Sequence, residues 1–116
     1  FIVQEYIDKP LLLDGYKFDL RIYVLITSCD PLCIFLYSDG LVRLATEKYV
    51  QPQETNINHL CMHLTNYSVN KRSELYDKNK AFDTGSKRSI RYFNEYLQRS
   101  DIDVGLLWRR IADMIV

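Results

Sequence analysis

Charged and apolar residues alternate along residues 17–22 and a mainly apolar run follows, and this pattern predicts a long β-strand over about residues 17–28. Successive side chains of a strand point to opposite faces, so Lys17, Asp19 and Arg21 share one face. The other face carries an uninterrupted apolar row, formed by Phe18, Leu20, Ile22, Val24 and Ile26. We therefore expect this segment to lie in a packed sheet whose second face carries two cations and one carboxylate.

Two more apolar segments, residues 32–37 and 41–46, follow this strand and predict two further strands. Residues 38–40 (Ser-Asp-Gly) have the composition of a tight hairpin turn, in which the glycine takes a positive φ. Together with the turn at residues 30–31, they predict an antiparallel meander of three strands. The apolar run at residues 1–7 predicts one more strand.

The last part of the chain has helical periodicity. Residues 88–99 predict a helix with Ile90, Phe93 and Leu97 on one side. A second helix is expected to begin after Asp103, a favourable N-cap residue, and to present an apolar stripe made of Val104, Leu107, Trp108, Ile111 and Ile115.

Between the predicted strands and helices, residues 59–67 suggest a short extended piece. Residues 70–87, rich in charge, Asn and Ser, predict a mobile loop. Strands that precede helices along the chain predict the α+β class, with an antiparallel sheet and helices after it.

The overall composition limits the classes of partner. The 116 residues carry 15 cations and 15 anions, a balance that argues against general electrostatic binding to nucleic acid or to anionic lipid. No apolar run reaches the length of a membrane-spanning helix, so we expect neither nucleic acid nor membrane as a partner. Three cysteines at no familiar disulfide spacing favour a reducing, intracellular setting. Because the chain starts without Met and ends inside a helical pattern, we expect a piece of a longer protein.

The charged face of the first long strand has two interpretations that the residues leave open. Charges on a half-buried sheet face are paired with one another or with a ligand. Two cations and a carboxylate suit a nucleotide, but they equally suit a cross-strand salt-bridge ladder. Arg43 can bind a carboxylate or phosphate with two parallel hydrogen bonds, or it can pair with Asp19 or Glu47.

Three polar segments add candidate chemistry. Residues 4–7 (Gln-Glu-Tyr-Ile) can offer backbone groups to a base edge, or form an ordinary edge strand. Thr65 and Asn66 can hydrogen-bond phosphate or metal-bound water, or form a self-capping turn. In residues 71–91 cations outnumber anions by seven to three, which suits an acidic substrate or a solvated loop.

A zinc site is a competing interpretation. His59, Cys61 and His63 would share one face of an extended segment, and Cys29 or Cys33 could complete four ligands. Common zinc modules place their ligands in closely spaced pairs, which this chain lacks.

Taken together, seven segments of this chain resemble the tubulin tyrosine ligase-like family, which has the ATP-grasp fold. The order and spacing of these segments match the family along the whole chain. Within the family, their sequences are most similar to the tubulin polyglutamylases, particularly the branch that modifies the β-tubulin tail. The seven segments are Gln4–Ile7, Pro10–Gly15, Lys17–Arg21, Thr27–Leu32, Gly40–Arg43, Met62–Tyr67 and Gly85–Arg88. The resemblance implies that residues 1–116 form an incomplete part of an ATP-grasp-like catalytic domain.

The resemblance also implies a reaction and its partners. Enzymes of this family use ATP and Mg²⁺ to phosphorylate a side-chain carboxylate in an acidic tubulin tail. The amino group of free L-glutamate then displaces phosphate from the acyl phosphate and forms an isopeptide branch. The implied location is cytoplasmic, at microtubules, and the cilium or basal body is a narrower implication of the same resemblance.

The resemblance assigns roles to fourteen residues. The nucleotide contacts it implies are Gln4, Glu5, Tyr6, Ile7, Lys17, Phe18, Asp19, His63, Thr65 and Asn66. Arg21 would face the reacting phosphate as the catalytic residue, and the pocket for incoming glutamate would be formed by Arg43, Tyr67 and Lys87. The family's metal ligands would lie beyond residue 116, so residues 1–116 alone are expected to be inactive. A catalytically inactive, microtubule-binding relative is the alternative to an active ligase.

Overall fold

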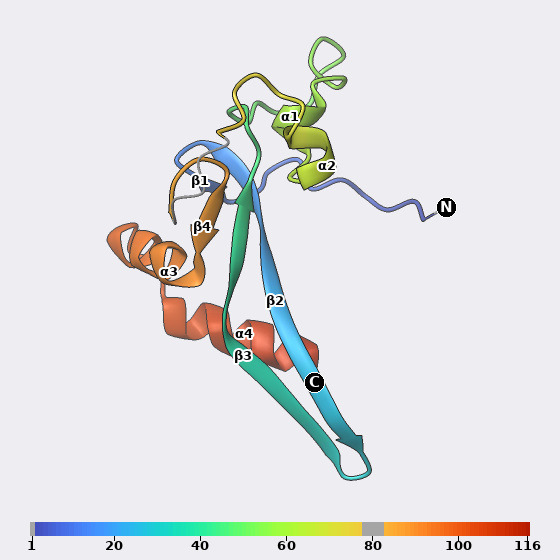
Figure 1. Cartoon of the computed structure of the whole chain (residues 1–116), viewed down its shortest axis with the longest axis vertical. Coiled ribbons are helices and arrows are strands. Elements are labelled where there is room, and N and C mark those ends of the chain that lie inside the picture. The colour runs from blue at the N-terminus through green and yellow to red at the C-terminus, as the bar shows by residue number, and fades with distance from the viewer. Residues whose placement is uncertain (1, 78–82) are drawn as a thin grey trace.

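The computed structural model describes residues 2–77 and 83–116 (Figure 1). Its elements, in chain order, are β1 (Leu12–Leu13), β2 (Tyr16–Cys29), β3 (Leu32–Leu44), α1 (Leu60–His63), α2 (Tyr67–Asn70), β4 (Lys87–Ser89), α3 (Ile90–Arg99) and α4 (Val104–Ile115). The four strands form one antiparallel sheet in the order β1-β2-β3-β4. The α+β class is confirmed, as is the antiparallel sheet with helices after it, and the arrangement is consistent with an incomplete ATP-grasp-like fold.

The sheet is dominated by one long hairpin, β2–β3. The prediction of a three-stranded meander is wrong, because β3 runs without a break from residue 32 to residue 44 and contains no turn at residues 38–40. The chain reverses instead at residues 30–31, between the paired residues Cys29 and Leu32.

Gly40 does not form the hairpin turn that was predicted for it. It takes no positive φ; it lies opposite Ile22, next to the point where the register of the two strands shifts. A Cβ atom on Gly40 would collide with the backbone carbonyl oxygen of Arg21. Glycine is therefore required here for the close approach of two backbones and not for a turn.

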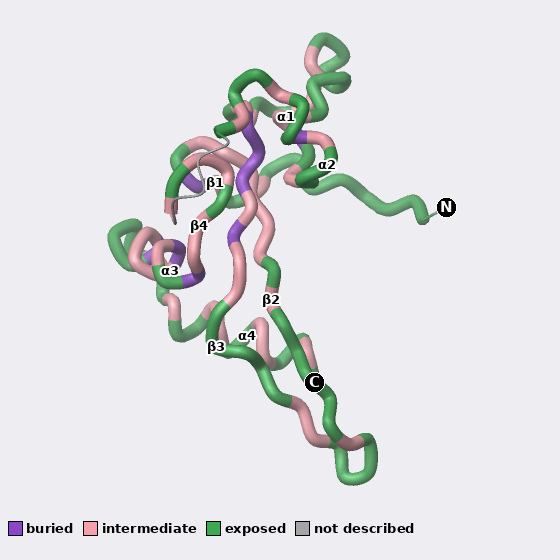
Figure 2. The backbone as a smooth tube through the Cα atoms, viewed as in Figure 1, coloured by how far each residue is buried: buried purple, intermediate pink, exposed green. Residues whose placement is uncertain are grey.

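The hydrophobic core lies between one face of the sheet and α3. The buried members of the core are Leu13, Val42, Leu44, Ile90, Phe93 and Leu97. Phe18 and Leu20 of β2 pack against them, and the rings of Phe18 and Phe93 lie 5.3 Å apart. The buried residues gather along β3 and α3 in Figure 2. The apolar row of the first long strand thus faces the core over its first half, as expected.

Both predicted C-terminal helices are present, with α3 beginning two residues later than expected. Each begins at a side-chain cap: Ser89 Oγ accepts a hydrogen bond from the backbone N–H of Tyr92, and the Asp103 carboxylate accepts one from that of Leu106. Such caps satisfy N–H groups that have no partner within the helix.

Two local predictions are wrong, and a third differs from the structure by one residue at each end. Residues 2–7 form no strand and are exposed, because no strand in the described part of the chain pairs with them. Residues 59–67 are not extended, since they contain α1 and the start of α2. The loop expected at residues 70–87 begins with the last residue of α2 and ends with the first residue of β4. Residues 78–82 of that predicted loop lie outside the described residues, as does Phe1.

The hairpin makes the molecule long. Its far end extends beyond the helices in Figure 1, and the principal extents are 51 × 35 × 28 Å. The radius of gyration is 16.1 Å, whereas a compact domain of this length has about 13 Å. Within the described residues, no helix has the length and apolar character needed to cross a membrane.

Candidate functional site

The polar face of the sheet carries a row of charges across three strands. Asp19 of β2 lies opposite Arg43 of β3, which lies opposite Lys87 of β4. Arg43 donates from Nε and Nη2 to the two carboxylate oxygens of Asp19, each at 2.9 Å. Arg21 Nε lies 3.0 Å from the same carboxylate.

The cross-strand salt-bridge ladder, one of the two interpretations of this charged face, is therefore present. One carboxylate is shared between two guanidinium groups, so the pairing does not neutralise the face. One positive charge remains in surplus, and Lys87 adds another. A sheet surface with this balance can form a ladder and still attract an anion.

A recess opens beside this row, at the end of β3. Four of the residues predicted for the site line it, and they come from β3, β4, α2 and the segment before α2: Arg43, Thr65, Tyr67 and Lys87. The ammonium groups of Lys71 and Lys87 each lie 5.5 Å from the centre of the Tyr67 ring. The three residues predicted to form the glutamate pocket thus lie in one place, although they are far apart in the sequence.

Asn70, which the sequence analysis did not single out, fixes this recess. The side chain is 1% exposed and also lines the recess. Its Oδ1 accepts hydrogen bonds from the N–H and hydroxyl of Thr46, both at 2.9 Å. Its Nδ2 donates to the carbonyl oxygens of Leu64 and Asn66. Asn70 therefore joins the end of β3 to the segment that carries Thr65, and no local sequence signal distinguishes it from a surface Asn.

The Asn66 side chain has no capping role. Asn66 stands at the N-cap position of α2, but its side chain makes no capping hydrogen bond. It is exposed.

Tyr6, Lys17, Tyr49 and His63 form a second cluster. The Lys17 ammonium lies 3.9 Å from the centre of the Tyr6 ring, and Tyr6 Oη lies 3.2 Å from His63 Nδ1. The His63 ring makes T-shaped (edge-to-face) contacts with the rings of both Tyr6 and Tyr49. Tyr49, which the sequence analysis also missed, donates its hydroxyl to the backbone oxygen of Asp8 at 2.7 Å.

Burial shifts the pKa of two members of this cluster. Desolvation lowers the pKa of Lys17, and Tyr49 opposes that shift electrostatically. Desolvation, followed by a hydrogen bond with Tyr6, raises the pKa of Tyr49 to about 12. A lysine whose ammonium is partly desolvated, yet held over an aromatic face, is suited to an anionic ligand.

The other residues predicted to contact the nucleotide do not join either of these two groups through their side chains. Gln4, Glu5 and Ile7 are exposed, so the predicted adenine segment is held through Tyr6 and Asp8. The Phe18 side chain packs in the core. A contact from Phe18 to a ligand on the polar face is therefore limited to its backbone.

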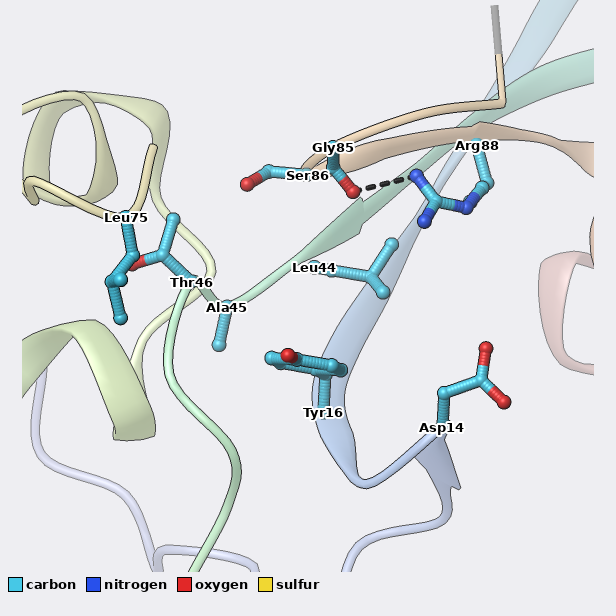
Figure 3. A pocket seen from close by; sticks show the side chains of 9 residues that line it. All are labelled: Asp14, Tyr16, Leu44, Ala45, Thr46, Leu75, Gly85, Ser86 and Arg88. Carbon is cyan, nitrogen blue, oxygen red and sulfur yellow. Dashed lines mark hydrogen bonds between the residues drawn. The ribbon is translucent and has the colours of Figure 1, made fainter. Parts of the chain in front are cut away.

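A second recess contains none of the residues predicted for the site. Figure 3 shows its lining, which consists of Asp14, Tyr16, Leu44, Ala45, Thr46, Leu75, Gly85, Ser86 and Arg88. Arg88 points toward Gly85 and donates from Nη1 to its carbonyl oxygen at 2.6 Å and to that of Lys87 at 2.9 Å. Arg88 thus braces the segment that carries Lys87.

The geometry assumed for a zinc site is not present. The segment from residue 60 to residue 63 is helical, and both ring nitrogens of His63 have hydrogen-bond partners. No group of three or more His, Cys, Asp or Glu residues suited to a metal ion occurs in the ranges 2–77 and 83–116.

Comparisons with known proteins show sequence similarity along the whole chain. The sequence profile described as "Tubulin-tyrosine ligase family" matches residues 1–116. The chain is 61% identical over 115 residues to tubulin polyglutamylase TTLL7 of Mus musculus, covering 99% of this chain and 13% of that protein. It is 51% identical over 115 residues to tubulin polyglutamylase TTLL13 of Homo sapiens, covering 99% and 14%, and 48% identical over 115 residues to tubulin polyglutamylase ttll6 of Danio rerio, with the same coverage. The chain thus spans about one seventh of the length of these relatives or slightly less.

Proposed function

Since the chain belongs to the tubulin-tyrosine ligase family, we propose that it is part of the catalytic domain of an ATP-dependent tubulin polyglutamylase. The reaction would join the amino group of free L-glutamate to a side-chain carboxylate in a tubulin tail. The relatives described above, all with tubulin polyglutamylase in their names, support this substrate. The corresponding location is the cytoplasmic microtubule cytoskeleton, with the cilium or basal body as a narrower proposal.

The observation that carries the proposal is the convergence of Arg43, Tyr67 and Lys87 on one shallow recess of about 10 Å³, so glutamate would lie over these three side chains and not inside the recess. Glutamate is a small dicarboxylate, and two cations and a hydroxyl are the groups that would hold it. Asp19 engages two of the five N–H groups of Arg43. Among the residues that the structure describes, no hydrogen bond is made by Nη1 of Arg43, so this side of the guanidinium would bind a second carboxylate while Asp19 orients the group.

The nucleotide would lie along the same face, on the side of Tyr6 and Lys17. Lys17 and Arg21 supply positive charge there, Arg21 with about half of its side chain exposed. Thr65, which lines the recess, and the neighbouring Asn66 would contact the phosphates of the nucleotide. When bound, ATP supplies the phosphoryl group that activates the carboxylate, and positioned cations stabilise the charge of that group during transfer.

We assign Arg21 to the reacting phosphate or acyl phosphate, because it is the more exposed of the two arginines that share Asp19. The Asp19 carboxylate limits the motion of Arg21 and Arg43 together, so the two guanidinium groups are held at a fixed separation. The ligands of Mg²⁺ are proposed to lie outside residues 1–116, as the family resemblance implies.

The full-length protein provides the test. Incubation with ATP, Mg²⁺, labelled glutamate and tubulin is expected to yield glutamylated tails, measured by mass spectrometry. Arg43→Ala removes a charge-assisted contact and should raise the KM for glutamate about tenfold or more, with a smaller effect on the KM for ATP. Arg91→Ala is the matched control, because Arg91 is exposed and pairs with Glu95 on the surface of α3.

Two outcomes would contradict the proposal. Absence of glutamate incorporation by a preparation that binds ATP would favour the inactive, microtubule-binding relative. A collapse of ATP affinity in the Arg43 variant, with glutamate use unchanged, would remove Arg43 from the glutamate pocket.

A further inference from the structure

His63 is a buried histidine with both ring nitrogens engaged. The residue is 5% exposed. Its Nε2 lies 3.1 Å from the backbone oxygen of Asn56, and its Nδ1 lies 3.2 Å from the hydroxyl of Tyr6. A ligand that approached the polar face would therefore find neither nitrogen available, unless these bonds were broken.

The partners of His63 fix the direction of the two bonds. A carbonyl oxygen only accepts hydrogen bonds, so Nε2 carries a proton and donates to Asn56. In the neutral ring, Nδ1 then accepts from the Tyr6 hydroxyl. The imidazole thus joins two segments that are about fifty residues apart in the sequence, and it does so through one donor and one acceptor.

Tyr6 is one of two points where the N-terminal segment contacts this cluster, the other being the backbone oxygen of Asp8, which accepts from Tyr49. The neighbouring side chains are exposed, with Ile7 at 70% and Val3 at 95%, whereas Tyr6 is 39% exposed. The same ring supports the ammonium of Lys17 at 3.9 Å. A change in the position of the Tyr6 ring would therefore move both the N-terminal segment and the cation.

We infer that His63 is a positioning residue of the nucleotide site, which acts through Tyr6 on residues 4–7 and on the Lys17 ammonium. This inference rests on the proposed function, because it takes residues 4–7 and Lys17 as nucleotide contacts. It changes the role of His63 from a group that touches phosphate to a group that holds the adenine segment against the sheet.

Four variants of the full-length protein test the inference. His63→Leu removes both hydrogen bonds, whereas His63→Asn keeps an acceptor near the Nδ1 position. Tyr6→Phe removes only the hydroxyl and retains the aromatic ring under Lys17. His59→Asn is the matched control, because the His59 side chain is 57% exposed and lies four residues earlier.

The first measurement is the dissociation constant of Mg-ATP. Loss of the hydrogen bond between His63 and Tyr6, which both variants share, should weaken binding about fivefold in His63→Leu and in Tyr6→Phe. The double variant should be no weaker than either single variant, because both changes break the same link. His63→Asn should retain most of the affinity, His59→Asn all of it, and the KM for glutamate should be unchanged throughout.

The second measurement needs no nucleotide. Hydrogen–deuterium exchange of residues 2–9 should be faster in His63→Leu and Tyr6→Phe than in the wild type and in His59→Asn. If wild-type protein does not bind Mg-ATP, the proposed function fails, while the exchange result still tests the link between His63 and Tyr6. If wild-type protein binds and the two single variants act additively, or leave both affinity and exchange unchanged, the role assigned to His63 is overturned.

Discussion

The two halves of the β2–β3 hairpin are both paired strands, but their side chains have very different surroundings. We call residues 16–22 and 40–44 the base, and residues 23–37 the tip. In the base, one face packs on α3 and the other carries the charges of the candidate site. In the tip, large apolar side chains are exposed on both faces, with Leu25 at 61% on one face and Ile26 at 57% on the other. Figure 2 shows this change from buried to exposed along the hairpin.

This difference shows that the side-chain pattern of a segment can predict a strand without predicting which other element packs on its faces. α3 covers the base because its apolar stripe meets the apolar row of β2 and β3. Within the ranges 2–77 and 83–116, no element packs on the tip to a similar extent. A two-stranded ribbon without a packed face is marginally stable, so the stability of this hairpin comes mainly from its base.

The largest expected effect comes from paired truncations of one phenylalanine in each region. Phe93 is 1% exposed and contacts the base, whereas Phe35 is 56% exposed in the tip. Phe93→Ala should lower the free energy of unfolding by about 4 kcal/mol, because it leaves a cavity. Phe35→Ala should cost about 0.5 kcal/mol or less. Urea denaturation followed by the fluorescence of Trp108, the single tryptophan, measures both.

A similar cost for the two variants would contradict the comparison. It would mean that the tip is buried in solution, for example by association of two chains. Repeating the denaturation at a tenfold different protein concentration tests for such association. The denaturation midpoint depends on protein concentration only if two chains associate through the tip.

Sequence reasoning succeeded where the signal is local. The strand at residues 17–28 and the two C-terminal helices follow from periodicity and from cap residues, and the structure confirms them. The turn at residues 38–40 was wrong because Ser-Asp-Gly gives the same signal whether glycine is needed for a turn or for a close backbone approach. Only the position of Arg21 on the neighbouring strand distinguishes the two, and that position is a property of the register.

The site shows the same division between local and long-range information. Alternation placed Asp19 and Arg21 on one face, and the structure joins their side chains there. The roles of Asn70 and Tyr49 could not be predicted, because each depends on partners more than twenty residues away. Short polar segments do not show which of their residues will be buried and fully hydrogen-bonded.

The second prediction concerns Gly40, which lies where the base meets the tip. Gly40→Ala should lower the free energy of unfolding by about 2 kcal/mol, because the new Cβ would meet a backbone atom that cannot turn aside. Gly105→Ala is the control. A Cβ there would meet no backbone atom, its nearest neighbours being the capping Oδ1 of Asp103 at 3.3 Å and Nη1 of Arg109 at 3.5 Å, and alanine has the higher helix propensity.

Denaturation midpoints of the two glycine variants provide the measurement. We expect a lower midpoint for the Gly40 variant and an unchanged or higher one for the Gly105 variant. Equal midpoints in wild type and the Gly40 variant would show that β2 and β3 separate at this point without cost, and that the base ends before residue 40.

The smallest expected effect is the pH dependence that Tyr49 gives to the base. Burial raises its pKa to about 12 from 10.0, so the folded state holds the phenolic proton more tightly than the unfolded state does. The stabilisation is complete below pH 10 and is lost as the pH rises toward 12. Tyr49→Phe should therefore flatten the fall of the unfolding temperature over this range, whereas Tyr37→Phe, in the tip, serves as the control for loss of a phenol. If the two variants lose stability equally steeply across this interval, the Tyr49 hydroxyl is not held in the folded base as its bond to Asp8 indicates.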